Sequence, residues 1–290
     1  MIRYATVIDI PEIKKIWDQS FEDPLSYVDF LYDKVMAPSD TIVYEEDGQI
    51  YSMAMSIYCS FRYHDDVIPC VYVYGCATLP DRSGRGIMTE MLTVVEANAI
   101  ARGCQMAVLV PGNRSLFRFY GGRGYNPDFS LRRVRLRSGM LNTVPRPEKP
   151  IEYDHLFSGD FYEIREKALY EIPHIEWKEE QLDFMAADAL AYQDHIASYD
   201  GEIGKAYAVY SLNKKVMYIR EILGTSEESA TALLAGLVDE QNPRTVTINL
   251  PVGGGILPVE GSKEIYGMSK AFKTAKNLSS LEPYMNLMLD

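Results

Sequence analysis

A glycine-rich segment in the first half of the chain has the composition of an anion-binding loop. It reads Gly84-Arg85-Gly86-Ile87-Met88-Thr89, after the almost continuously apolar residues 67–79 and before a segment with helical spacing of apolar residues. Backbone N–H groups at a helix start bind phosphate well, because the helix dipole favours negative charge there. Glycine lets the backbone approach closely, and Arg82 and Arg85 can add positive charge. We expect a pyrophosphate site here, although the loop alone would also suit a tight turn without a ligand.

Two common families of phosphate loop are excluded by the same residues. The pattern G-x-x-x-x-G-K-[ST] is absent, since no Lys-Ser or Lys-Thr follows the glycines. The pattern G-x-G-x-x-G is satisfied by Gly84 and Gly86 but fails at Thr89. Hydrolase chemistry finds no support either, because a G-x-S-x-G turn and a Ser/His/Asp arrangement are lacking near Ser83.

Further motifs follow the loop in a fixed order, and together they resemble the GNAT superfamily, most closely its Eis-type acetyltransferases. The run Cys76–Met88 is similar to the family segment V-x-P-x-x-R/Q-x-x-G-x-G/A. An Asn-containing turn at Asn113 precedes Phe119-Tyr120-Gly121-Gly122-Arg123-Gly124-Tyr125, which is similar to the family motif F/L-Y-x-x-x-G-F/Y. The sequence departs from the family at Ser83, where Arg or Gln is usual, and at Met88, where a small residue is usual.

The resemblance implies an α/β, mixed-sheet GNAT fold that binds acetyl-CoA as a cosubstrate. In that family the strand before the loop splays from its neighbour and pairs with pantetheine, and here that strand end would be Cys76, Ala77 and Thr78. The full set of cofactor-binding residues carried over is Cys76, Ala77, Thr78, Gly84, Arg85, Gly86, Ile87, Met88, Thr89, Asn113, Ser115 and Leu116.

The resemblance also implies direct attack of a neutral primary amine on the thioester, with Tyr120 as the general acid. A tyrosine with an ordinary pKa near 10 suits donation to a forming thiolate. The base is left open between Tyr72, Tyr74 and a water chain, and Eis-type enzymes suggest the C-terminal carboxylate, here that of Asp290. The acceptor would be a cationic small molecule or a lysine side chain. The alternative is a non-catalytic acyl-CoA-binding or sensing protein.

The first half of the chain alternates helical and strand patterns. Apolar residues with helical spacing predict helices over residues 8–21 and 24–35. The glycine loop precedes a third predicted helix, which ends at Gly103. The turn Asp47-Gly48 joins two strands. The expected strands are residues 2–6, 41–44, 50–61, 67–79, 106–110 and 129–136, and a short helix covers residues 115–120.

The second half repeats this order without the glycine loop. Residues 216–223, 226–240 and 245–250 have strand, helix and strand patterns, and Pro251 ends the last of them as Pro111 ends residues 106–110. We therefore expect a catalytic acetyl-CoA-binding domain over residues 1–137 and a Pro-containing linker over residues 138–150. A second, degenerate GNAT-like domain over residues 151–290 would shape the acceptor cleft or a dimer interface. A sterol-carrier-like fold is the rival prediction for that second half.

Composition limits the remaining function classes. The net charge of −12 is concentrated in residues 141–290, where 24 acidic residues outnumber 14 basic ones, so we expect no nucleic-acid partner. An acidic surface near an active site would attract a cationic amine. Alternatively, the acidic residues contribute only to solubility. No segment reaches the ~20 apolar residues of a membrane span, and the N-terminus lacks the pattern of a signal peptide. We expect a cytoplasmic protein without a metal, with four free thiols and with a homo-oligomer left open.

Overall fold

Two compact units make up the chain, and neither is continuous in sequence. The structure, a computed structural model, describes residues 1–154, 158–191, 194–254, 260–272 and 278–287. Unit 1 contains Met1–Ser60, Ile68–Asn126 and described residues 268–272. Unit 2 contains Phe61–Val67, Pro127–Gly267 and described residues 278–287.

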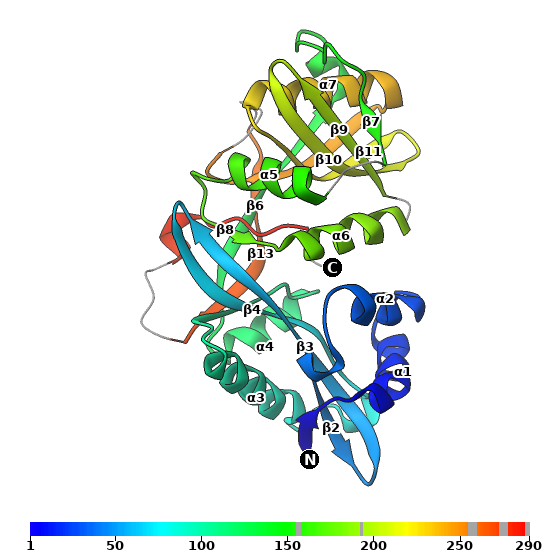
Figure 1. Ribbon diagram of the computed structural model, residues 1–290, viewed down its shortest axis with the longest axis vertical. Coiled ribbons are helices and arrows are strands. Elements are labelled where there is room, and N and C mark those ends of the chain that lie inside the picture. The colour runs from blue at the N-terminus through cyan, green and yellow to red at the C-terminus, as the bar shows by residue number, and fades with distance from the viewer. Residues whose placement is uncertain (155–157, 192–193, 255–259, 273–277, 288–290) are drawn as a thin grey trace. The chain divides into compact units, whose positions relative to one another are not determined.

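Unit 1 is a mixed sheet with helices on two sides. In Figure 1, α1 and α2 lie on one side of strands β2–β4, and α3 and α4 lie on the other. The strand order is β1-β2-β3-β4-β5, with β13 beside β5. The elements are β1 (Ile2–Tyr4), α1 (Ile10–Ser20), α2 (Ser26–Lys34), β2 (Thr41–Glu46), β3 (Gln49–Tyr63), β4 (Asp66–Thr78), α3 (Ile87–Ala101), β5 (Met106–Leu109) and α4 (Arg114–Gly121).

The strands of unit 2 also pair in both directions, and α7 and α5 pack on opposite sides of β9–β11 (Figure 1). Its strand order is β6-β12-β11-β10-β9-β7. The elements are β6 (Asn126–Arg137), β7 (Glu152–Tyr153), α5 (Ser158–Ala168), β8 (His174–Glu176), α6 (Glu179–Ala191), β9 (His195–Gly201), β10 (Gly204–Asn213), β11 (Val216–Gly224), α7 (Glu227–Gln241), β12 (Thr245–Pro251) and β13 (Ser262–Ala271). Short 3-10 turns are Val7–Asp9, Pro38–Asp40, Pro80–Arg82, Ser138–Leu141 and Leu278–Leu281.

The expected helices and strands of the first half are confirmed, with ends that shift by a few residues. The predicted turn at Asp47-Gly48 joins β2 to β3 with positive φ at both residues, +51° and +77°. This backbone twist matches the twist of a tight two-residue hairpin. Buried residues of unit 1 include Trp17, Val71 and Met91.

Two strands belong to a different unit from the one that the sequence predicted. β6, expected within residues 1–137, pairs antiparallel with β12 from Arg137↔Thr245 to Leu131↔Pro251. Its Val134 and Leu136 belong to the buried core of unit 2. In return, the end of β13 pairs with β5 from Met268↔Leu109 to Ala271↔Met106. Sequence pattern could not assign these strands, because apolar alternation fits any sheet edge with free hydrogen-bonding groups.

The topology of unit 2 repeats that of unit 1. In unit 1 an antiparallel hairpin leads to β4, then α3, then β5 parallel to β4. In unit 2 the hairpin β9–β10 leads through β11 and α7 to β12, which is parallel to β11. The two units therefore share the order hairpin, strand, helix and parallel strand, and the GNAT-like assignment of the second half stays a prediction. Helices α5 and α6 and strand β8 had not been predicted.

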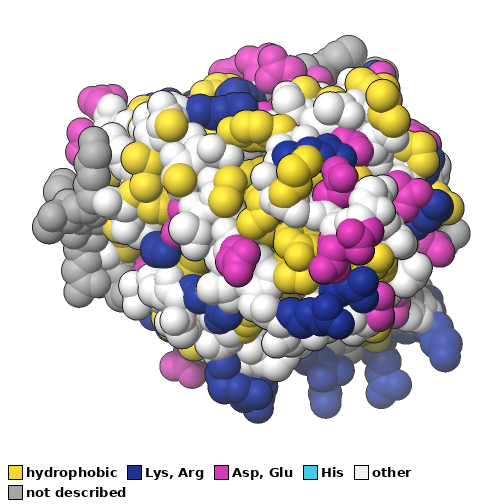
Figure 2. Space-filling view, turned by 90° about the horizontal axis from the view of Figure 1, so that it is seen from below, with side chains coloured by type: hydrophobic (Ala, Val, Ile, Leu, Met, Phe, Trp, Pro, Cys, Tyr) yellow, Lys and Arg dark blue, Asp and Glu magenta, His cyan; other side chains and the backbone are white. Residues whose placement is uncertain are grey.

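Charges of both signs are mixed on the molecular surface seen in Figure 2, with hydrophobic side chains between them. Surface charge on that face therefore marks no single binding region. Among the described helices, none combines the length and apolar composition required to cross a membrane.

A fully buried ionic group lies inside unit 2. Glu221 on β11 accepts hydrogen bonds from Tyr207 Oη at 2.5 Å and Tyr284 Oη at 2.7 Å. The Arg165 guanidinium Nε lies 3.4 Å from the same carboxylate, and both side chains are 0% exposed. Arg165 also donates to the carbonyl of Ile175 at 2.8 Å. These contacts hold the segment around Tyr284 against α5 and β11.

Replacing Glu221 with alanine is expected to lower the free energy of unfolding by about 3–5 kcal/mol, because Arg165 loses its fully buried counter-charge and keeps only Glu166 at 3.6 Å. Urea unfolding followed by circular dichroism measures the loss. The matched control is Glu264→Ala, which breaks a surface pair with Arg133, 46% and 42% exposed, and should cost about 1 kcal/mol or less. Equal stability of the two variants would contradict the expectation.

Candidate active site

The two central strands of unit 1 pair over only part of their length. Parallel pairing between β4 and β5 runs from Cys70↔Met106 to Tyr72↔Val108, whereas β4 continues to Thr78. The last residues of β4 therefore extend beyond the paired region. A strand edge without a partner strand can hydrogen-bond an extended ligand, which is the role expected for this segment.

The backbone near this strand end is shaped by Gly75, which sequence reasoning missed. Gly75 has a φ of +54° within β4. A Cβ atom there would lie 3.0 Å from the Trp17 ring and 3.1 Å from Met55 Sδ. Only glycine combines this φ with this close approach, so Gly75 sets the path of β4 just before Cys76. A lone glycine inside a strand pattern was the available signal.

Of the three strand residues expected to meet pantetheine, Ala77 has its carbonyl already engaged. Ser52 Oγ on β3 donates to Ala77 O at 2.7 Å and lies 2.8 Å from Thr78 Oγ1. Leu79 N donates to Tyr51 O at 2.8 Å, also on β3. Ala77 thus faces β3, and Cys76 and Thr78 offer backbone groups toward the opposite edge, since successive groups alternate along a strand.

The glycine loop forms the start of α3 as expected. Gly84 and Gly86 have φ values of +77° and +84°, and Gly86 is the residue before the helix. A Cβ atom at either glycine would meet nothing within 4 Å. Glycine cannot cap the helix with a side chain, so the first N–H groups of α3 open onto free space. This is the geometry of an anion site at a helix N-terminus.

The other predicted residues of this loop differ in exposure. Ile87 is buried in the core, whereas Met88 and Thr89 are half-buried and Arg85 is exposed. Arg82 does not serve as a free cation, because its Nε lies 2.7 Å from Glu46 and its Nη1 lies 2.9 Å from Asp81. The loop charge that we expected from two arginines therefore rests on Arg85.

Asn113 acts as the N-cap of α4. Its Oδ1 accepts hydrogen bonds from Ser115 N at 3.0 Å, Leu116 N at 3.1 Å and Ser115 Oγ at 2.5 Å. The predicted trio Asn113, Ser115 and Leu116 is therefore brought together, with the Asn113 carbonyl oxygen committed to capping. The cap fixes where α4 begins, and so where its last turn carries Tyr120.

Tyr120 meets Cys76 at the end of β4. The side chain of Tyr120 is 6% exposed, and it shares a hydrogen bond with the Cys76 thiol. Burial, followed by the nearby Cys76, raises the pKa of Tyr120 well above its usual range. Burial also raises the pKa of the partly buried Cys76 thiol to about 12, although the hydrogen bond from Tyr120 opposes the rise. Both groups are protonated at neutral pH.

Arg123 connects the two helices of the site and was not predicted to be functional. Its Nε donates to Thr89 Oγ1 at 3.0 Å, and its Nη1 donates to Phe119 O at 2.6 Å. The guanidinium lies 3.5 Å from the centroid of the Phe119 ring. Its positive charge lowers the pKa of Tyr120, opposing burial. Arg123 stood at an unassigned position of the tyrosine motif, so the sequence carried no specific signal for it.

Replacing Arg123 with glutamine is expected to lower kcat/KM for the acyl donor about tenfold, the scale of a lost charged hydrogen bond. The physical reason is that the start of α3 loses its connection to α4 while Tyr120 loses a stabilising cation. Steady-state kinetics measure the change. Arg118→Gln is the control, because Arg118 is exposed on α4, two residues before Tyr120; an equal effect there would assign the loss to general surface charge.

A group of aromatic side chains surrounds the other candidates for the base. Tyr74 Oη lies 2.9 Å from Tyr27 Oη, and the Tyr74 ring centroid lies 5.8 Å from that of Trp17. Tyr72 is almost fully buried. Asp23, which sequence reasoning missed, is half-buried, and burial raises its pKa while the nearby Trp17 indole opposes the rise. Asp290 lies outside the described residues.

Comparison with known families supports the assignment drawn from this geometry. Residues 1–127 match the family model of the acetyltransferase (GNAT) domain. Residues 1–127 form a GNAT acetyltransferase domain. The chain therefore contains a GNAT acetyltransferase domain, and Gly84–Thr89 and Tyr120 lie inside the matched region.

Relatives of this GNAT protein include one curated enzyme and many solved structures. The S-alkylcysteine N-acetyltransferase of Bacillus subtilis is 26% identical over 166 residues, which cover 51% of this chain and 91% of that protein. A GCN5-related N-acetyltransferase from Anabaena variabilis has a TM-score of 0.74 at 14% identity and covers 94% of this chain and 73% of its own. The Eis protein of Mycobacterium abscessus has a TM-score of 0.70 at 14% identity, covering 93% and 73%. The structural likenesses extend over both units and concern the fold alone.

Among the described residues, no group of three or more His, Cys, Asp or Glu side chains is placed to hold a metal ion. The site described above is built from backbone N–H groups, a tyrosine, a thiol and an arginine.

Proposed function

We propose that this GNAT protein transfers an acetyl group from acetyl-CoA to a primary amine of a small, cationic molecule or a lysine, by direct attack in a ternary complex. One observation carries the proposal: a protonated Tyr120 lies at the end of β4, and Arg123 connects its helix to the glycine loop at the start of α3. A phosphate site and a proton donor are thus built into the same set of elements.

The residues present fit acetyl-CoA. Gly84 and Gly86 leave open space beside the start of α3, and Arg85 is exposed next to them. These groups would hold the pyrophosphate through backbone N–H groups and one cation. The backbone N–H and C=O groups of Cys76 and Thr78 lie beyond the paired part of β4 and β5. They would hold the pantetheine arm by hydrogen bonds like those between strands.

Tyr120 would supply the proton that the leaving group needs. The amine nitrogen forms a bond to the acetyl carbon, the carbon–sulfur bond breaks, and the sulfur takes the phenolic proton. Cys76 orients the hydroxyl, and the charge of Arg123 makes the proton easier to release. The amine must lose its own proton, and Asp23 joins Tyr72, Tyr74, a water chain and the Asp290 carboxylate as a candidate for that role.

The expected pH profile follows from Tyr120. Because burial raises its pKa above 10, the proton-donating form persists through pH 10. The rate should therefore rise with pH as the acceptor amine becomes neutral, without a descending limb below pH 10. Steady-state kcat/KM measured from pH 6 to 10 with two amines of different pKa checks this. A descending limb near pH 8, common to both amines, would contradict it.

The activity is tested by incubating the protein with acetyl-CoA and a panel of amines while free thiol is followed. The panel should contain polyamines, aminoglycosides, lysine peptides and S-alkylcysteines, the last because the Bacillus subtilis relative is named for them. We expect at least one amine to raise thiol release above hydrolysis and to yield an N-acetyl product by mass spectrometry. If CoA binds and no amine does so, the alternative function of a non-catalytic acyl-CoA binder replaces the proposal.

A further inference from the structure

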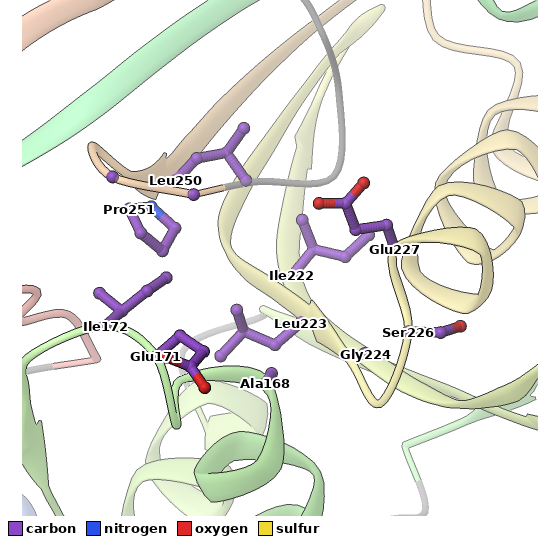
Figure 3. Close-up of a pocket in the computed structure, with 12 residues that line it drawn as sticks. Ala168, Glu171, Ile172, Ile222, Leu223, Gly224, Ser226, Glu227, Leu250 and Pro251 are labelled. Carbon is purple, nitrogen blue, oxygen red and sulfur yellow. The ribbon is translucent and has the colours of Figure 1, made fainter. Parts of the chain in front are cut away.

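Unit 2 contains a cavity at the position that corresponds to the strand end of the GNAT site in unit 1. Parallel pairing between β11 and β12 runs from Val216↔Thr245 to Ile219↔Ile248. Just beyond it, Ile222 and Leu223 of β11 and Leu250 and Pro251 of β12 line a cavity of about 230 Å³ (Figure 3). The repeated topology has therefore kept a binding space between the two strand ends.

The phosphate end of this second site is closed. Ser226 caps α7, accepting from Ser229 N at 3.0 Å and donating to Ile203 O at 2.7 Å. A Cβ atom on Gly224 would lie 2.5 Å from Ser229 Oγ, in contrast to the open space beside the loop glycines of unit 1. Glu227 and Glu228 in the first turn add negative charge. The acidic first turn would repel a pyrophosphate, and the Ser226 cap already occupies the Ser229 N–H group.

What remains suits a ligand with an aliphatic body and a positive charge. Polar and apolar atoms share the cavity wall almost evenly, and the aliphatic part has Ile172 and Pro251 on one side and Ile222 on the other (Figure 3). Two acidic residues, Glu171 and Glu227, belong to the lining, and none of the described lining residues is basic. In Figure 3 the Glu227 carboxylate lies beside Ile222 at the edge of the cavity.

We propose that this cavity binds a small aliphatic ammonium ion, with the hydrocarbon chain between β11, β12 and Ile172 and the charge at Glu227. The volume of about 230 Å³ corresponds to roughly eight water-sized groups, which suits a primary amine with a chain of about six carbons. The proposal goes beyond acyl transfer, since it requires no acyl donor and no residue of the GNAT domain.

The test is a methyl NMR titration of the full chain, labelled at isoleucine and leucine methyl groups, with n-hexylammonium chloride. Ile172→Val and Ile222→Val assign the two reporter signals. We expect saturable shifts at both reporters, a response absent with hexanoate, and weakening by about twofold to fivefold in Glu227→Gln, the range for an exposed charge pair. Glu228→Gln is the matched control, because Glu228 is exposed beside Glu227 and does not line the cavity.

Each other outcome overturns the proposal in a recognisable way. Equal affinities for hexylammonium, hexanol and hexanoate would show that the cavity binds hydrocarbon chains and does not select a positive charge. Shifts confined to isoleucine and leucine methyl groups of unit 1 would place the amine in unit 1 alone. Equal weakening by Glu227→Gln and Glu228→Gln would reduce the effect to general surface charge. None of these results depends on acetyl transfer, which the thiol assay tests separately.

Discussion

Tyr120→Phe is expected to lower kcat by about 10²-fold or more, while the affinity for acetyl-CoA stays within about twofold. The loss has the size of one missing general acid. The structure makes the substitution clean, because the ring is buried among Phe119 and Tyr125 at centroid distances of 5.1 and 5.7 Å, and phenylalanine preserves that packing. Steady-state kinetics give kcat, and calorimetry with CoA gives the affinity.

The control for this variant is Tyr125→Phe. Tyr125 is also a buried tyrosine with a pKa raised by burial, but it lies beside Glu96 and Lys270, and Cys76 contributes least to the rise. We expect kcat of Tyr125→Phe within about twofold of the unmodified protein. An unchanged kcat in Tyr120→Phe would remove that residue from the mechanism, whereas equal losses in both variants would indicate a packing effect.

Gly86→Asp is expected to weaken CoA binding by about 10³-fold. The carboxylate would stand at the start of α3 against the pyrophosphate, and two unit charges ~4 Å apart near a protein surface repel by ~4 kcal/mol. The substitution would also place a side chain at a φ of +84°, a conformation that asparagine and aspartate tolerate better than other residues. Calorimetric titration with CoA measures the affinity.

Two controls separate charge from backbone strain in that experiment. Gly86→Asn has nearly the same shape without the charge, so the difference between the Asp and Asn variants reports repulsion alone. Gly48→Asp introduces the same residue at a φ of +77° in the β2–β3 hairpin, so it reports the folding cost of a positive φ. Retention of CoA binding by Gly86→Asp would show that the phosphate site lies elsewhere.

Local sequence was sufficient for the loop and for most elements of unit 1. Gly84 and Gly86 adopt positive φ, a conformation that glycine reaches at lower cost than other residues. A glycine-rich stretch after an apolar strand therefore predicts such a loop. The tyrosine motif likewise placed Tyr120 on a short helix, as found in α4. Such features depend on a residue and its near neighbours in the chain.

Contacts between residues far apart in the sequence could not be predicted from the sequence pattern. Arg82 and Arg123 looked alike in sequence, yet Arg82 is paired with Glu46 and Arg123 reaches Thr89. Whether an arginine is free for a ligand depends on what the fold brings within about 4 Å of it. The role of Gly75 depends in the same way on Trp17 and Met55.

The sequence by itself determined that the chain has a glycine loop at a helix start, an Asn-capped helix and a tyrosine in GNAT order, because these follow from local conformation and spacing. Only the tertiary structure decided which sheet takes β6 and which takes β13, since strand edges are chemically equivalent until the chain is folded. It also decided that the corresponding strand end of unit 2 keeps a cavity while its helix start is closed by Ser226. That difference arises because Ser229 packs against Gly224. The residue types alone do not show whether the space beside a glycine is occupied.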